Sequence, residues 1–194
     1  MYIQHLYGLF SHPHAEWASI KQENYSMTHV YLAHLAVLAA IPAISLYFGT
    51  TQVGLSLTGD EYLTLSTDRA LPLSIAFYFA MLVGVGFMSY ITFWMEKTFG
   101  AEASFERCLT FISFTATPMF LFPVIWLNVL VVMGAVCYSL YLLYVGVPIF
   151  MNIPEERGFI FASSILTAGL CTLIGFMAAT IIIWGSGIIP ALAI

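Results

Sequence analysis

The segment LFSHPHAEW, at positions 9–17, is denser in side chains capable of chemistry than any other stretch of the sequence. Glu16 follows His12 by four positions, so the two side chains share one face of a helix, whereas His14 points elsewhere. Imidazole and carboxylate groups bind zinc and similar divalent metals, but a zinc site needs three or four such ligands. The segment therefore predicts either part of a metal or proton site, or only the polar start of a helix.

Two further histidines, His29 and His34, lie near the start of the first long apolar run. An ionisable group in a membrane helix is costly and often functional, but a neutral histidine can also simply hydrogen-bond to a carbonyl. If the N-terminal segment folds back onto the apolar helices, these side chains converge with the first cluster. The candidate ligands of a divalent metal are therefore His12, Glu16, His29 and His34, and no other cofactor is predicted.

The composition identifies the elements that must position these residues. Of the 194 residues, 61% are hydrophobic and 8% are charged, and the mean hydropathy is +0.94. A soluble domain has about 25% charged residues, so this chain cannot cover itself with a polar surface. The bilayer must therefore be its solvent.

Five apolar runs follow one another along the chain, separated by shorter polar segments. A transmembrane helix needs about 20 mostly apolar residues. We therefore expect an all-α integral membrane protein, a bundle of five transmembrane helices at residues 27–48, 70–95, 108–122, 124–150 and 159–184. Residues 1–26 form a cytoplasmic N-terminal segment in this prediction, and residues 27–194 form the transmembrane domain.

A short amphipathic helix is expected over residues 13–24, before the first span. Pro13 suits a first helical position, and Trp17 and Ile20 share its face at i+4 and i+7. Such a helix is expected to lie in the cytoplasmic membrane interface with Trp17 at headgroup depth.

The basic residues predict the orientation, because short cytoplasmic loops are rich in Lys and Arg. With a cytoplasmic N-terminus, Lys21, Lys97, Arg107 and Arg157 lie inside and Arg69 lies outside. The sequence therefore predicts an N-terminus in the cytoplasm and a C-terminus on the other side.

Several classes of function are disfavoured. The net charge is −5 and the five basic residues are scattered, so a nucleic-acid partner is not expected. Cys108, Cys137 and Cys171 show no CxxC spacing, and no GxSxG, HExxH, Walker or GxGxxG motif occurs, so the protein is not predicted to be an enzyme. Every Asp and Glu lies in a loop or at a helix end, which weighs against an acid-driven carrier.

Two kinds of feature leave transport open. Pro42, Pro118 and Pro148 interrupt three spans and free carbonyls, as in helices that line transport sites, although kinks also occur in structural bundles. The polar stretches SFTAT (113–117) and ASSILTAG (162–169) could line a path or allow close helix packing, and packing is the preferred interpretation. Tyrosines at 138, 141 and 144 form a stripe suited to a partner or a neighbouring helix.

The sequence resembles the bacterial branch of the Yip1 family. The resemblance is carried by LFSHPHAEWASIKQEN (9–24), AAIPAISLYFGTTQVG (39–54), FTATPMFL (114–121) and YSLYLLYVGVPIFMNIPEERGFIFASS (138–164). It implies five spans, an inner-membrane location and a periplasmic C-terminus. Eukaryotic members act in secretory traffic, bind Rab-type GTPases and form oligomers, but their DLYGP-type motif is reduced here to HLYGLF (5–10). The trafficking activity is therefore not carried over, and the family supplies no catalytic residue.

Two hypotheses follow. The first is a non-enzymatic inner-membrane protein that organises the membrane through contacts with lipids and through a homo-oligomer or a membrane-protein partner. The second is a small transporter or channel for an ion, with the histidine cluster binding a metal or a proton at the cytoplasmic side.

Overall fold

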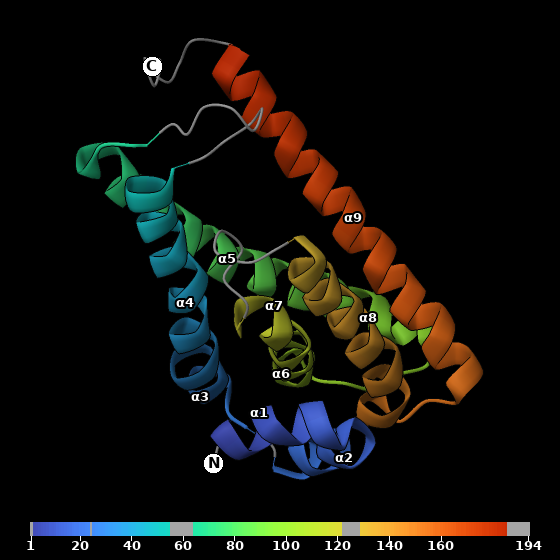
Figure 1. Ribbon diagram of the computed structural model, residues 1–194. Helices are drawn as coiled ribbons and strands as arrows, with labels where there is room; N and C mark the ends of the chain where they lie inside the picture. The colour runs from blue at the N-terminus through green and yellow to red at the C-terminus, as the bar shows by residue number, and fades with distance from the viewer. Residues whose placement is uncertain (1, 24, 55–63, 122–128, 186–194) are drawn as a thin grey trace.

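The computed structural model describes residues 2–23, 25–54, 64–121 and 129–185 (Figure 1). These residues form helices joined by short connections, and no strand occurs among them. In chain order the α-helices are α1 (Tyr2–Ser11), α2 (Pro13–Glu23), α3 (Met27–His29), α4 (Ala36–Phe48), α5 (Thr67–Glu96), α6 (Phe105–Thr115), α7 (Thr117–Leu121), α8 (Val129–Met151) and α9 (Glu155–Gly185). Two π-helical segments, Val30–Leu35 and Gly49–Val53, flank α4, and a 3₁₀ turn, Lys97–Phe99, extends α5.

The described part of the chain contains four helices that are long and apolar enough to cross a membrane. They are Met27–Gln52, Thr67–Phe99, Val131–Met151 and Glu155–Ala178. The predicted class, an all-α membrane protein, is confirmed by these helices. Pro42 and Pro148 lie inside α4 and α8, as the sequence predicts.

The third predicted span takes a different form. It is divided into α6 and α7 at Ala116, and each piece is too short to cross a membrane alone. Pro118 accounts for the division, because it has no N–H to donate to the carbonyl of Phe114 and is tolerated only in the first turn of a new helix. The predicted end of the third span and start of the fourth fall on residues 122–128, and the C-terminus on 186–194, outside the described residues.

One end of the bundle, which we call the N-terminal end, collects α1, α2 and three helix termini. The end of α5 meets the start of α9, where the rings of Phe99 and Phe161 stack with centroids 4.7 Å apart. The end of α8 lies beside α2, since Lys21 Nζ donates a hydrogen bond of 3.0 Å to the carbonyl of Ile149. Figure 1 shows α1 and α2 lying across this end, with the last turns of α9 at the opposite end.

Specific turns fix the connections at the N-terminal end. After α8, Asn152 adopts a positive φ of 57° and Ile153 N–H donates to the Pro148 carbonyl at 3.2 Å, which is a Schellman ending. After α5, Gly100 adopts φ of 74°, a conformation that glycine tolerates without strain. The buried carboxylate of Glu96 then accepts a hydrogen bond from the N–H of Ala103, which ties the turn to α5.

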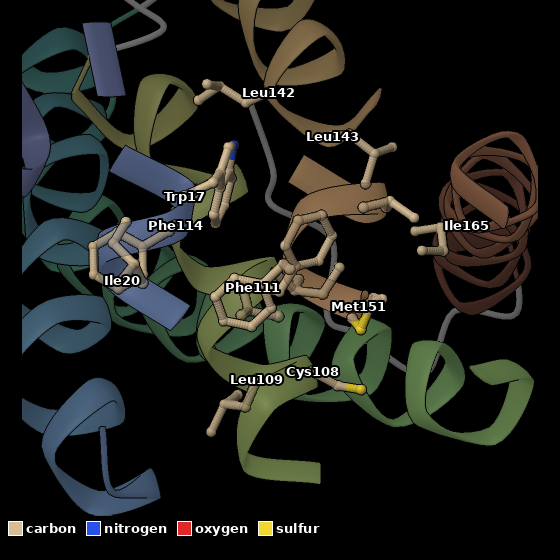
Figure 2. Close-up of a cluster of buried hydrophobic side chains, with 14 of the residues drawn as sticks. Trp17, Ile20, Cys108, Leu109, Phe111, Phe114, Leu142, Leu143, Met151 and Ile165 are labelled. Atoms are coloured by element: carbon tan, nitrogen blue, oxygen red, sulfur yellow. The ribbon is translucent and has the colours of Figure 1, made fainter. Parts of the chain in front are cut away.

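The core is centred on α6, whose residues Cys108 to Thr115 are all buried. Figure 2 shows Trp17 of α2 beside Phe111 of α6 among side chains of α8 and α9. The Trp17 ring lies 5.0 Å from that of Phe111 and 5.7 Å from that of Phe150, measured between centroids. Gly146 makes this approach possible, because a Cβ atom there would lie 2.6 Å from Trp17 Cε2.

The apolar face of α2 is buried against the bundle. The helix forms at Pro13–Glu23 as predicted, but Trp17 and Ile20 are 0% and 1% exposed and belong to the protein core. Trp17 therefore packs against protein and not against lipid headgroups, and its predicted depth in the membrane stays a prediction. Packing each of these side chains against protein contributes about 1.5–3 kcal/mol, which docks α2 onto the bundle.

Candidate functional site

The N-terminal end contains a polar cluster in which a buried histidine lies between two carboxylates. His5 of α1 contacts the carboxylate of Glu16 through Nδ1, while its Nε2 lies 2.8 Å from the Tyr25 hydroxyl and 3.1 Å from Glu23 Oε1. The Tyr25 hydroxyl in turn donates a hydrogen bond to Glu23. Both ring nitrogens of His5 therefore have a polar partner within reach. We call these four residues the His5 cluster.

The local fold explains how the His5 cluster forms. The chain turns between α1 and α2, where His12 N–H donates to the carbonyl of Gly8 at 2.7 Å and Glu16 N–H donates to that of His12 at 3.0 Å. A Cβ atom at Gly8 would overlap the Glu16 carboxylate. Glycine at position 8 is therefore what allows this carboxylate to reach across to His5.

A second polar contact lies deeper in the bundle. His34, 2% exposed, places Nε2 3.1 Å from Thr117 Oγ1 at the break between α6 and α7. Its ring stacks on Phe114 with centroids 4.2 Å apart, and the His5 and Tyr25 rings approach the same phenylalanine at 6.2 and 6.3 Å. Phe114 is thus a shared neighbour of the buried histidine and of the His5 cluster.

The four predicted metal ligands occupy different positions. Glu16 contacts His5, His34 lies in the interior, and His12 and His29 are exposed, with His29 stacked near Tyr25 at 6.3 Å. Within the described ranges, no group of three or more His, Cys, Asp or Glu side chains is arranged to hold a metal ion. The divalent-metal site therefore stays a prediction from the sequence.

Sequence reasoning missed His5. It precedes Glu16 by eleven positions and lies in a different helix, so no helical spacing rule connects the two. The available signal was the apolar, helix-compatible stretch Tyr2–Ser11, which places His5 one turn before the buried Leu9. Chemically, the cluster can hold α1, α2 and the start of the first span together, and it can exchange a proton between carboxylates through the imidazole.

Comparison with known proteins identifies the family. A family model described as the Yip1 domain matches residues 7–188. The chain belongs to the Yip1 family. It is 40% identical over 191 residues to inner membrane protein YohC of Escherichia coli strain K12, covering 95% of this chain and 98% of that protein. The protein of the same name from E. coli O6:H1 strain CFT073 matches with the same identity and coverage, and no solved structure matches the chain.

The Yip1 relationship confirms the resemblance noted from the sequence. The match begins at residue 7, so it includes α2 and the glycine at position 8, whereas His5 lies before it. Together with the four long apolar helices, the relationship to an inner membrane protein identifies this Yip1-family chain as a membrane protein.

Proposed function

We propose that this Yip1-family protein is a non-enzymatic protein of the bacterial inner membrane that organises the membrane through lateral contacts with lipids and with a second copy or another membrane protein. The observation that carries the proposal is the exposure of α5 and α9. Only 17% of the most apolar stretch of each is buried, against 39% for the span Met27–Gln52. These long helices therefore offer most of their surface to whatever surrounds the protein in the bilayer.

The second half of α9 shows this exposure to the surroundings most clearly. Between residues 170 and 177 its large apolar side chains are more than half exposed, and a Cβ atom at Gly175 would meet no atom within 4 Å. In Figure 1, α9 diverges from the other helices toward the C-terminus. The exposed side chains are Leu170, Leu173, Ile174, Phe176 and Met177.

A groove between α4 and α5 supports lipid contact at another face. It has a volume of about 410 Å³ and is lined by apolar and aromatic side chains, including Ala43, Tyr47, Leu71 and Phe79. An apolar groove that opens sideways from two spanning helices suits an acyl chain or a helix of a neighbouring protein.

Chain direction supports five crossings. Both α5 and α8 run toward the N-terminal end, since Phe99 and Ile149 both lie there. Two successive spans with the same direction need a crossing between them, and the buried helices α6 and α7 lie between the two spans in the sequence. We infer a five-helix Yip1 domain over residues 27–194, with α6 and α7 forming the third, broken span.

Charge supports the orientation. Four basic residues lie at the N-terminal end: Lys21 in α2, Lys97 after the end of α5, Arg107 near the start of α6 and Arg157 near the start of α9. Arg69 lies in the first turn of α5, at the far end of the bundle. By the positive-inside rule this end faces the cytoplasm. Residues 1–26 are then a cytoplasmic segment lying over the bundle at membrane-interface level, and the C-terminus is periplasmic.

Native cysteines allow a direct test of lateral association. Cys171 of α9 and Cys137 of α8 are both exposed, whereas Cys108 is buried. We expect a thiol crosslinker to produce a dimer in native membranes, and Cys171→Ser to remove it more strongly than the control Cys137→Ser. If the purified protein is a monodisperse monomer, gives no crosslinked species and leaves lipid behaviour unchanged, the proposal is wrong.

A second candidate function, ion or proton transport, is favoured by one observation, the approach of both His34 and His5 to the ring of Phe114. Two imidazoles that approach the same ring, one of them in the interior of the bundle, could pass a proton from one to the other. The test is flux into proteoliposomes, measured across a panel of ions and protons. Absence of flux from the wild-type protein would exclude this function without affecting the first.

A further inference from the structure

Two of the chain's five basic residues come together at the N-terminal end. Lys21 of α2 and Arg107 of α6 both line a hollow of about 480 Å³, together with Ala18, Gln22 and Ile149. The same two residues also line a smaller adjoining hollow of about 60 Å³ with Ser104, Glu106 and Thr110. We call the two together the basic hollow.

Neither cation in the basic hollow is neutralised by the described protein. Lys21 Nζ donates one hydrogen bond to the Ile149 carbonyl, so two of its three donors remain. Arg107 uses its backbone N–H on Ser104 Oγ at 3.3 Å, but its guanidinium forms no ion pair within the described ranges. Glu106 also lines the smaller hollow, so the charged residues that line the basic hollow carry a net excess of one positive charge.

The donors are of the kind that recognise phosphate. A guanidinium presents a planar fork of N–H groups that matches two phosphate oxygens, and an ammonium adds a compact point charge. The neighbouring side chains Ala18 and Ile149 are apolar, so the same hollow can also contact the first carbons of a lipid's acyl chain. The amide of Gln22 can hydrogen-bond to a headgroup hydroxyl or ester.

The location selects the source of the phosphate. The basic hollow lies at the end of the bundle that carries four of the five basic residues, where the cytoplasmic headgroups meet the protein. Anionic lipids are enriched at that surface, and basic pockets between membrane helices bind their headgroups. We propose that Lys21 and Arg107 bind the phosphate of an anionic phospholipid.

This inference deepens the proposed function, because it names one lipid class that the protein contacts. The two ideas can fail separately. Crosslinking through α9 reports lateral association and does not depend on Arg107, whereas lipid retention reports the basic hollow and does not depend on α9.

The test measures phospholipid retained by the full-length protein after detergent exchange, using native mass spectrometry. We expect wild-type protein, offered equal amounts of phosphatidylglycerol and phosphatidylethanolamine, to retain the anionic lipid preferentially. Arg107→Gln should lower that retention by about ten-fold, the effect of losing one charged hydrogen-bonding group. Arg107→Lys should keep part of it, because it preserves the charge.

The matched control is Arg157→Gln, which removes an exposed arginine from the same end of the bundle but outside the basic hollow. It should retain the anionic lipid like wild type. A second arm offers inorganic phosphate and glycerol 3-phosphate and follows thermal unfolding. Stabilisation by these soluble ligands alone would assign the site to a free phosphate ester rather than to a lipid.

Two results would overturn the proposal. One is wild-type protein that retains phosphatidylethanolamine as well as phosphatidylglycerol, a result that does not depend on any variant folding. The other is equal loss of anionic lipid in Arg107→Gln and Arg157→Gln, which would indicate general surface charge instead of a site.

Discussion

Replacing Gly146 by alanine tests the docking of α2 against α8. The added Cβ would lie 2.6 Å from Trp17 Cε2 and 2.7 Å from Phe111 Cε2. The tryptophan has little room to withdraw, because it is 0% exposed and also packs against Phe150. Overpacking of this kind costs about 1–3 kcal/mol, and the better helix propensity of alanine offsets up to about 1 kcal/mol. We expect a net loss of about 1–2 kcal/mol in the free energy of unfolding.

The matched control is Gly134→Ala in the same helix. A Cβ atom at Gly134 would meet nothing within 4 Å, so this variant gains helix propensity without a clash. It should be neutral or stabilised by up to about 1 kcal/mol. Equilibrium unfolding in mixed micelles, followed by far-ultraviolet circular dichroism, measures both variants. The informative result is whether the change in the free energy of unfolding has opposite signs in the two variants.

A double-mutant cycle makes the test specific to the contact with α2. Trp17→Leu removes the ring that the new methyl group would strike, so it should cost less in the Gly146→Ala background than in the wild type. Residues in contact commonly show a coupling energy of about 0.5–3 kcal/mol. Additive effects of the two substitutions, or equal effects of the two alanine variants, would refute the packing of α2 against α8.

Three other predictions follow from the site and the topology. Gly8→Ala should push the adjacent carboxylate away from its histidine, so limited proteolysis should cut between α1 and α2 faster than in wild type, and an unchanged cleavage rate would contradict the His5 cluster. Thr117→Val should leave His34 without its hydroxyl partner and lower the free energy of unfolding by about 1–3 kcal/mol, measured in the same micelle assay. In a background lacking the exposed native cysteines, Ser11→Cys should react with an impermeant thiol reagent only from the cytoplasmic side and Ser66→Cys only from the periplasmic side; the reverse pattern would invert the proposed topology.

The long helices could be predicted because the length of an apolar run is enough to indicate a membrane-spanning helix. Three predicted spans correspond closely to Met27–Gln52, Thr67–Phe99 and Glu155–Ala178. The division of the third predicted span into α6 and α7 was harder to predict, although Pro118 marks the place of the break. Its two pieces are buried by neighbouring helices, which a run of apolar residues cannot distinguish from contact with lipid.

The same ambiguity affected α2 and the site. The sequence predicts an apolar face through Trp17 and Ile20, but lipid and protein are both apolar partners, and only the fold decides between them. The contact of Glu16 with His5 depends on how α1 turns back at His12, a tertiary feature without a spacing rule. The predicted metal site combined three histidines and one glutamate from two neighbouring segments, whereas the observed polar contacts join Glu16 to His5 of α1 and His34 to Thr117 of α7.

The docking of α2 has a consequence for synthesis of the protein. Chains emerge N-terminus first, so α2 is complete long before the helices that cover it. The carbonyl that accepts the hydrogen bond of Lys21 is synthesised 128 positions later in the chain. The rings that pack against Trp17, those of Phe111 and Phe150, are also synthesised later. During that interval the membrane surface is the available apolar partner for the tryptophan. The apolar face of α2 then contacts the membrane surface while the chain is being synthesised, and it packs into the protein core once the later helices have formed.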